Sequence, residues 1–278
     1  MCVQTATRSA KVNGRKLRRV ALSMESINNF RELGNLPVAN GVIRPGLLFR
    51  SGHLAAMSDN DAQQLTESGL RTIVDLRNDS DIDSEGLDRV PKGVAHYRVP
   101  IYDDAGRGDD LRATIIRGDM NALRAEMGEG RGHQLALDGS VGLVVNAERR
   151  ATFAAAMTII TDPHNWPLLW HCSAGKDRAG WIGTAVLLAA DASPETIVNH
   201  YLESNGRVGS AERFPDGELK ELIRPFIEVH REYVLAQLAA VEDHWGSTEA
   251  LFLDGFGIGA DALLRFRTAL VSSPPAFD

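Results

Sequence analysis

Cysteine is scarce in this 278-residue chain, which holds only Cys2 and Cys172. Two cysteines so far apart exclude a disulfide scaffold and a cysteine-rich zinc site. No pair of histidines has the helical spacing of metal ligands either, so we expect no metal and no other cofactor. The cysteine in the body of the chain, Cys172, is therefore either an apolar filler or a reactive thiol.

Long apolar runs are also absent. No stretch approaches the roughly 18 apolar residues of a membrane-spanning helix, and residues 1–20 lack the apolar core of a signal peptide. We therefore expect no stable membrane insertion and a cytoplasmic location. The absence of a signal peptide leaves export by a non-standard route open. Hydrophobic residues make up 44% of the chain and charged residues 24%, values that exclude a disordered or fibrous protein.

Positive charge is in short supply beyond the first 20 residues. The net charge is −7, although residues 1–20 carry six bases and no acid. The rest of the chain is therefore strongly acidic and should repel nucleic acid. We interpret residues 1–20 as a basic segment, either a solvated tail or an edge strand, and residues 21–278 as one domain. The oligomeric state is left open.

The order of the expected elements favours an α/β fold, because helices and strands alternate. The expected strands are short apolar runs at 70–76, 93–101 and 167–171. The expected helices lie at 150–161, 181–190, 217–244 and 260–271. An acidic loop is expected at 79–88. Residues 103–147 hold eight glycines and one short helical candidate near 121–127, so we interpret them as an insertion or lid.

One segment combines residues that share a chemical use. It joins the strand at 167–171 to the helix at 181–190 and reads His171-Cys172-Ser173-Ala174-Gly175-Lys176-Asp177-Arg178-Ala179-Gly180. Backbone N–H groups that curl over a helix N-terminus bind oxyanions, and the helix dipole adds partial positive charge. A cysteine in such a place ionises readily and becomes a nucleophile. The segment predicts a phosphate-binding loop over residues 173–178.

Individual residues of this loop have candidate roles. Cys172 is the candidate nucleophile, and the planar guanidinium of Arg178 can grip two phosphate oxygens. Gly175 permits the close approach of an anion. Two alternatives are a buried, unreactive cysteine and a nucleotide-binding P-loop. The second fails because it needs glycine where Trp170 stands and serine or threonine where Asp177 stands.

The string His171-Cys172-x-x-Gly175-x-x-Arg178 resembles the signature of the cysteine-dependent protein tyrosine phosphatases, and the AGKDR variant is similar to a bacterial branch of that family. Other segments resemble the same branch in order, at 29–34, 46–51, 74–77, 201–205 and 253–255. The resemblance covers roughly residues 15–272. It implies a central sheet of four to five strands flanked by helices, a catalytic domain over 21–278, and an insertion at 103–147 that can cover the site.

The resemblance also implies the reaction, which is hydrolysis of phosphomonoesters through a phosphocysteine. Phosphotyrosine is the first implied substrate, and phosphoserine, phosphothreonine and phosphoinositides are further ones. Lys176 is similar to a lysine that attracts multiply phosphorylated substrates in lipid phosphatases. Asp177 is the first candidate for the general acid, Asp75 the second, and Asp103 or Asp104 the third. His171 is expected to orient the loop and tune Cys172, or else to be purely structural.

One residue departs from the family pattern. Ala179 stands where the family has a threonine or serine, whose hydroxyl assists departure of the thiolate from the phosphocysteine. This favours, as an alternative function, a phosphatase-shaped module that binds phosphorylated ligands with little turnover. A sulfurtransferase or arsenate reductase also places a reactive cysteine in an anion loop, but it leaves the later family segments unexplained.

Overall fold

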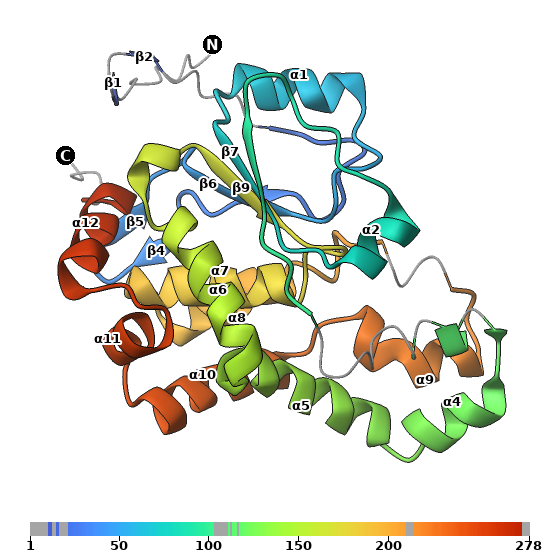
Figure 1. Ribbon diagram of the computed structural model, residues 1–278. Coiled ribbons are helices and arrows are strands. Elements are labelled where there is room, and N and C mark those ends of the chain that lie inside the picture. The colour runs from blue at the N-terminus through green and yellow to red at the C-terminus, as the bar shows by residue number, and fades with distance from the viewer. Residues whose placement is uncertain are drawn as a thin grey trace, which may run out of the picture.

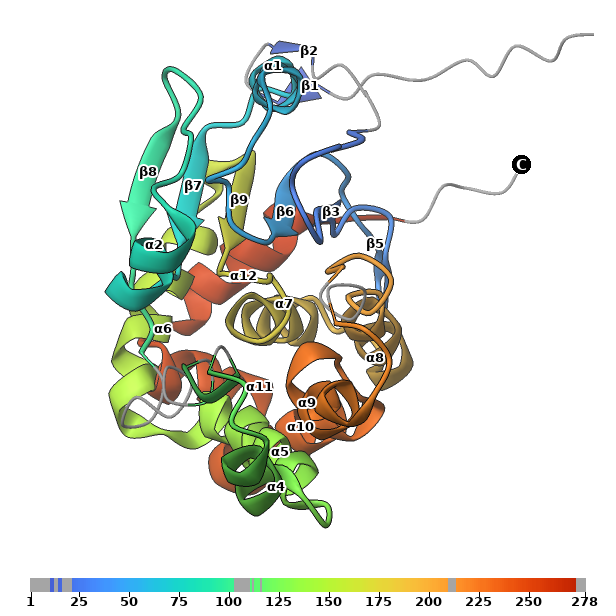
Figure 2. The ribbon, with the colours of Figure 1, turned by 90° about the vertical axis from the view of Figure 1, so that its right-hand side faces the viewer.

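The computed structural model describes residues 11–12, 15–16, 22–102, 111, 113–115, 117–209 and 214–273. These residues form an α/β fold around a five-stranded sheet with the order β3-β6-β9-β7-β8 (Figure 1; the strands appear in this order, from right to left, in Figure 2). The strands are β3 (Arg31–Glu32), β6 (Leu48–Ser51), β9 (Leu168–His171), β7 (Thr72–Asp75) and β8 (Ala95–Arg98). The expected fold class, with a sheet of four to five strands flanked by helices, is confirmed.

Four of the five strands run parallel, and only β3 is antiparallel to its neighbour β6. The parallel strands therefore end at one edge of the sheet, where His171 is the register partner of both Ser51 and Asp75. Ligand sites of parallel sheets lie at this carboxyl edge. The expected phosphate-binding loop starts here, at the residue after His171.

The helices of the described residues include α1 (Asp59–Glu67), α2 (Asp79–Glu85), α4 (Met120–Met127), α5 (Arg131–Val145), α6 (Ala147–Ile160), α7 (Arg178–Ala189), α8 (Pro194–Leu202), α9 (Glu218–Ile227), α10 (Arg231–Trp245), α11 (Thr248–Ala250) and α12 (Ala260–Leu270). They also include a 3-10 turn, η2 (Pro163–Asn165), and a π-helical turn, η4 (Leu251–Gly255). Helix α1 packs on one face of the sheet and α6, α7 and α12 on the other, whereas α4 and α9 lie away from it (Figure 1). No helix of the described ranges is both long and apolar enough to cross a membrane.

Short strands pair outside the main sheet. β10 (Val271–Ser272), β5 (Gly41–Ile43) and β4 (Pro37–Val38) form a three-stranded sheet, which ties the C-terminal end of the described chain to its early part. β1 (Lys11–Val12) and β2 (Arg15–Lys16) pair with each other. Most of the basic segment 1–20 lies outside the described residues, and its interpretation stays a prediction.

Side-chain alternation along the strands divides the core into two clusters. Ile73 and Leu169 belong to the smaller cluster, which includes Leu65 of α1. Their neighbours Val74 and Leu168 belong to the larger cluster, to which α6, α7, α10 and α12 contribute. Both faces of the central strands are thus buried. This burial explains why successive residues in these strands are apolar, Ile73 and Val74 in β7 and Leu168 to Trp170 in β9, as in strands of covered parallel sheets.

Three sequence-based expectations need correction. The acidic loop expected at 79–88 begins with helix α2, because Asn78 and Asp81 form a reciprocal capping box. The single helix expected at 217–244 is two helices, α9 and α10. Pro225 lies in the last turn of α9, lacks a backbone donor, and is followed by the end of the helix at Ile227.

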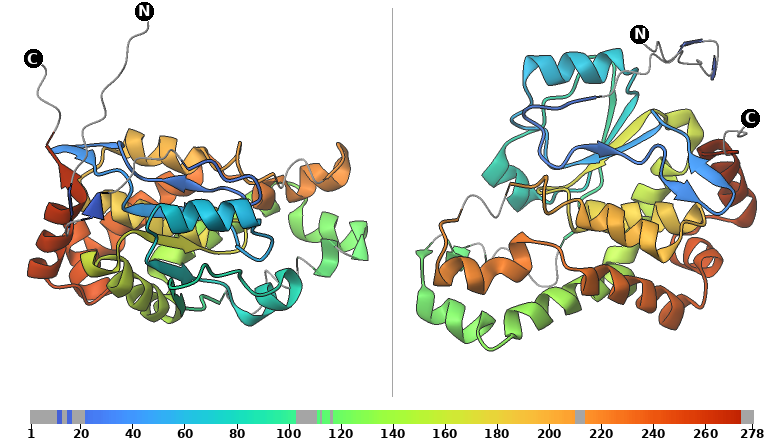
Figure 3. Two further views of the ribbon diagram at one scale, coloured as in Figure 1. Left: turned by 90° about the horizontal axis from the view of Figure 1, so that it is seen from above. Right: turned by 180° about the vertical axis from the view of Figure 1, so that it is seen from behind.

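The third correction concerns residues 103–147. The short helix expected near 121–127 is α4, but the glycine-rich stretch after it forms a second helix, α5, which the sequence did not predict. α5 runs beside α10 (Figure 3, right). The hydroxyl of Ser140 donates to the carbonyl of Tyr233 (3.1 Å) and accepts from the amide of Gln237 (3.0 Å). Tertiary packing therefore outweighs the low helix propensity of glycine here.

Candidate active site

The expected phosphate-binding loop occupies residues 172–177 between β9 and α7. Cys172 opens the loop and is 3% exposed. The loop turns sharply at Gly175, whose φ is +71°. A Cβ atom at this position would lie 2.3 Å from the carbonyl oxygen of Ser51, at the end of β6. Only glycine fits, because both the backbone angle and the close approach exclude a side chain.

Donors from elsewhere in the chain hold the carbonyl oxygens of this loop. The backbone N–H of His53 donates to Ser173 O (2.9 Å), and the side-chain amide of Asn29 donates to Ala174 O (3.0 Å). Arg50 Nη2 donates to Gly175 O (2.7 Å). In a planar trans peptide the N–H points opposite to the carbonyl. The N–H groups that follow these three carbonyls therefore face away from their donors, which is the orientation that an anion cradle requires.

Arg50 is a functional candidate that sequence reasoning did not single out. Its side chain is fully buried and also reaches Lys176 O (3.4 Å). Two glycines of α7 make room for it, since a Cβ at Gly183 would lie 2.9 Å from Arg50 Nη1. Burial lowers the pKa of Arg50 to about 10, so the guanidinium keeps its charge at neutral pH. The sequence held one signal for Arg50, because this residue lies in segment 46–51, which resembles the bacterial branch of the family.

Arg178, the first residue of α7, lies beside Cys172 and is held on several sides. Its Nη1 forms an ion pair with Asp81 Oδ2 (2.6 Å), and its Nη2 donates to Ser173 Oγ (3.2 Å). Burial lowers the pKa of Arg178, but the negative charges of Cys172 and Asp81 outweigh it and raise that pKa. Asp81 thus orients Arg178. The sequence did not reveal this, because Asp81 belongs to a helix that was expected as a loop.

Lys176 and Asp177 form a pair at the exit of the loop. Lys176 Nζ contacts both carboxylate oxygens of Asp177 at 2.9 Å. The lysine side chain is 8% exposed, whereas the aspartate side chain is 53% exposed. The charge of Lys176 is therefore partly balanced before any substrate binds.

A pocket of about 760 Å³ lies against the loop. Lys176, Asp177 and Arg178 line one end of it, while α5, α9 and α10 contribute apolar and aromatic residues such as Leu135, Phe226 and Tyr233. α4, α5 and α9 pack against one another away from the sheet (Figure 1). The pocket is much larger than a phosphate ion, so it has room for the organic part of a phosphate ester.

Asp75, the second candidate acid, is not among the residues that line this pocket. It is 1% exposed and accepts from Arg77 N (2.9 Å), Arg77 Nε (3.1 Å) and Arg77 Nη2 (3.1 Å). These contacts favour a structural role, in which the carboxylate stays paired with Arg77. Asp103 and Asp104, the third candidates, lie outside the described residues.

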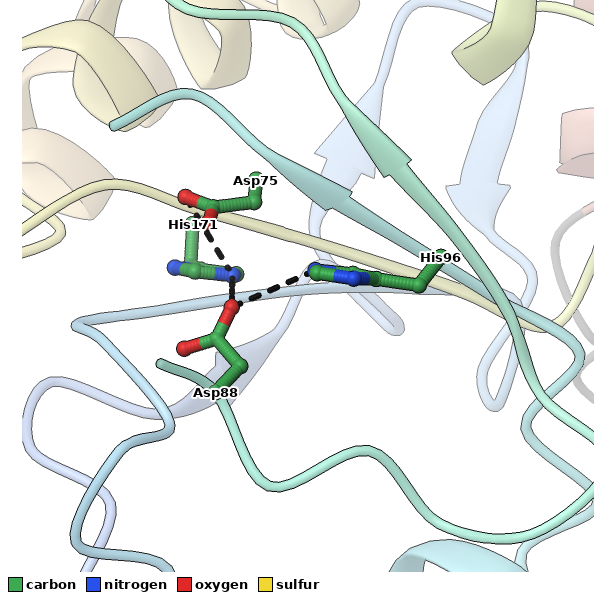
Figure 4. A group of neighbouring side chains, drawn as sticks. All are labelled: Asp75, Asp88, His96 and His171. Atoms are coloured by element: carbon green, nitrogen blue, oxygen red, sulfur yellow. Dashed lines mark ion pairs between the residues drawn. The ribbon is translucent and has the colours of Figure 1, made fainter. Parts of the chain in front are cut away.

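His171 lies in a buried polar cluster behind the loop (Figure 4). Asp75, Asp88, His96 and His171 offer ligand-type atoms within 4.8 Å of one another, as metal sites do. The guanidinium of Arg77, however, contacts both carboxylates, with Nη2 2.8 Å from Asp88 Oδ1. Arg77 supplies the positive charge that a metal would bring, so the arrangement is a network of buried ion pairs.

The model of the tyrosine phosphatase family matches residues 22–272. The chain belongs to the tyrosine phosphatase family. This membership confirms the resemblance seen in the sequence, and it makes the chain a phosphatase.

Two curated relatives span most of this phosphatase. A protein of Cupriavidus necator named as a tyrosine-protein phosphatase is 29% identical over 92% of this chain and 90% of its own length. The triple specificity protein phosphatase PtpB of Mycobacterium tuberculosis is 27% identical over 87% of this chain and 96% of its own.

Solved structures are more distant. The core catalytic domain of the PP-IP phosphatase SIW14 from S. cerevisiae has a TM-score of 0.36 and 14% identity, covering 79% of this chain and 98% of that one. TpbA of P. aeruginosa in complex with pTyr has a TM-score of 0.31 and 14% identity, covering 73% of this chain and 90% of that one.

The role of Arg50 in this phosphatase can be tested with Arg50→Lys. An ammonium keeps the charge but loses the rigid planar group that aims Nη2 at the carbonyls of Gly175 and Lys176, and a hydrogen bond to a neutral acceptor is worth about 1 kcal/mol. We expect kcat/KM for an aryl phosphate to fall by about fivefold. Steady-state kinetics and inorganic phosphate binding measure the effect.

Arg44→Lys is the matched control, because Arg44 also donates to backbone carbonyls, those of Val271 and Thr268, but far from the loop. We expect it to leave kcat/KM unchanged. Equal losses in the two variants would remove Arg50 from the site.

Proposed function

We propose that this phosphatase hydrolyses phosphomonoesters by double displacement, through a phosphocysteine on Cys172. The observation that supports this most is the arrangement of one loop. It opens with a buried cysteine, turns at Gly175 against β6, and ends in Arg178 at the N-terminus of the twelve-residue helix α7. The positive end of a helix favours both the binding of an oxyanion and the formation of a thiolate, so one helix N-terminus can serve both steps of the reaction.

In the first step, the backbone N–H groups of the loop and Arg178 bind the phosphoryl oxygens. The Cys172 thiolate attacks phosphorus, the P–O bond to the leaving group breaks, and the leaving oxygen takes a proton from Asp177. In the second step, water attacks the phosphocysteine and gives a proton to Asp177. The P–S bond breaks, the thiolate is restored and inorganic phosphate leaves.

Asp177 fits the acid role better than Asp75 does, because it lines the pocket and is half exposed. To donate a proton it must first hold one, and in the structure both its carboxylate oxygens accept from Lys176. A bound phosphate offers Lys176 a stronger partner. We therefore expect substrate binding to draw the ammonium toward the phosphate and free Asp177 to take up its proton.

Phosphotyrosine in proteins is the substrate class that we propose first. Cys172 is almost fully buried, so a long side chain is needed to bring phosphorus to its sulfur. The aromatic and apolar residues of the pocket can pack against a phenyl ring. An assay of phosphate release compares phosphotyrosine peptides with phosphoserine peptides, phosphothreonine peptides and phosphoinositides.

Cys172→Ser tests the nucleophile. We expect it to abolish turnover while inorganic phosphate still binds, because a serine hydroxyl does not ionise at neutral pH but the cradle and Arg178 remain. Phosphate release and calorimetric binding measure the two effects. Turnover above a trace in the variant would refute a phosphocysteine. A wild-type protein that binds phosphopeptides without releasing phosphate would instead indicate a binding module.

Asp177→Asn tests the acid. General-acid catalysis contributes about 10²–10⁴-fold and matters most for basic leaving groups. We expect the variant to lose far more activity on phenyl phosphate than on an ester of an acidic phenol. Asp75→Asn should lose activity equally on both substrates. The opposite pattern would transfer the role to Asp75.

Ala179→Thr tests the missing hydroxyl. Without that hydroxyl, hydrolysis of the phosphocysteine should be the slow step of the wild type, visible as a burst of phenol before a slower steady rate. We expect the threonine to raise the steady rate and shrink the burst. Ala179→Val is the control, because valine has the shape of threonine without its hydroxyl. If valine has the same effect as threonine, packing is the cause.

A further inference from the structure

The carboxylate of Asp88 is the centre of the buried network behind the loop. Its side chain is 0% exposed, and its Oδ1 accepts from Leu54 N (2.9 Å) and contacts Arg77 Nη2 (2.8 Å). Its Oδ2 lies 3.0 Å from His171 Nε2 and 3.3 Å from His96 Nε2. Figure 4 shows Oδ2 between the two imidazole rings. The reaction described above does not use this residue.

Both ring nitrogens of His171 face atoms that can only accept a hydrogen bond. Nδ1 lies 3.3 Å from the carbonyl oxygen of Cys172, and Nε2 faces the Asp88 carboxylate. A carbonyl and an ionised carboxylate have no proton to donate. Each nitrogen must therefore carry its own proton to make a favourable contact, and a ring with two protons is an imidazolium cation.

The charge balance of the network leads to the same protonation state. Asp75 and Asp88 are fully buried carboxylates, and Glu85 lies 3.5 Å from Arg77 Nη1. Arg77 alone cannot balance three negative charges. Buried charges without partners are costly, so a positive His171 stabilises the cluster.

The titratable groups that face His171 come from several elements. They are Asp75 of β7, Arg77 after it, Asp88 after α2, His96 of β8 and His53 after β6. Burial lowers the pKa of His171, but the contact with Asp88 and the charges of Asp88 and Asp75 outweigh it and raise that pKa. Burial lowers the pKa of His53, which therefore adds no opposing charge at neutral pH.

We propose that Asp88 is a positioning residue of the phosphatase reaction, which keeps His171 protonated and, through this ring, stabilises the thiolate of Cys172. The inference rests on the proposed nucleophile. His171 is adjacent to Cys172 in the chain and contacts its carbonyl, whereas Asp88 lies on the far side of the ring. The positive ring therefore lies against the backbone of the residue that carries the thiolate, in contact with its carbonyl. Arg178 and the helix N-terminus act from the opposite end of the loop.

The protonation state of His171 can be measured in the unaltered protein. Nitrogen NMR of a sample with ¹⁵N-labelled histidines, assigned with His171→Gln, distinguishes an imidazolium from either neutral tautomer. An ordinary histidine loses its proton with a midpoint near 6.5. Because the pKa of His171 is raised, we expect its ring to keep both protons above this midpoint. A neutral His171 ring at pH 7 would overturn the proposal, and this measurement needs no variant of Asp88.

Asp88→Asn tests the effect on the nucleophile. In a Cys2→Ser background, Cys172 is the remaining thiol of the sequence, and its rate of alkylation by iodoacetamide against pH reports the thiolate. We expect the variant to move the alkylation midpoint upward by about one pH unit, which slows alkylation about tenfold at lower pH. The acid limb of kcat/KM should move with it.

Asp61→Asn is the matched control. Asp61 is another fully buried carboxylate, which accepts from the backbone of Glu25 (3.0 Å) and Ser26 (2.9 Å), and its described contacts include no histidine. It should lower stability without moving the alkylation midpoint. An unmoved midpoint in folded Asp88→Asn would refute the role of Asp88. Alkylation of Cys172 that leaves the enzyme active would refute the proposed nucleophile instead, so the two failures are distinguishable.

Discussion

The site depends on the seating of one short loop against the end of β6. At Gly175 the backbone approaches Ser51 so closely that no side chain fits between them. Donors from His53, Asn29 and Arg50 bind the outer carbonyls of the loop. These contacts leave the inner face lined by N–H groups. An anion cradle made of backbone needs this support, because a peptide unit presents its donor only when its acceptor is satisfied on the other side.

Buried charge is the second constraint on the site. Arg50, Arg178 and His171 surround the loop, and Arg178 and His171 are each held by a carboxylate from outside it. Arg178 is paired with Asp81 and His171 with Asp88, while Arg50 binds carbonyl oxygens. Cations that are buried and already oriented need no reorganisation when an anion or a thiolate forms, so their electrostatic effect is available at once.

The pocket beside the loop arises from helices that are distant in the sequence. α5 follows the early strands, whereas α9 and α10 follow α8, and the three meet above Lys176, Asp177 and Arg178. Ser140 links α5 to α10 through Tyr233 and Gln237. The interpretation of 103–147 as a lid stays a prediction, but its helical part packs into the body of the molecule. Substrate selection therefore depends on packing between segments that the loop motif does not include.

The sequence by itself determined the strand, loop and helix that carry the chemistry. The apolar run at 167–171, the glycine at 175 and the helix from 178 are local features, and local preferences are readable along one segment. The family signature added the order of the remaining segments. This is why the fold class, the family and the candidate nucleophile all followed from residues alone.

Only the tertiary structure decided which residues act on that loop from outside it. Arg50, Asp81 and Asp88 are separated from Cys172 by more than 80 positions, and the local sequence around Asp81 and Asp88 does not mark them as partners of the loop. Likewise, only the structure shows that Arg77 binds both oxygens of Asp75, the second candidate acid. Helix α5 forms despite its glycines, which have low helix propensity, because α10 packs beside it. Pairing of buried charges and packing of distant helices are interactions between residues far apart in the sequence, so they cannot be predicted from local sequence preferences.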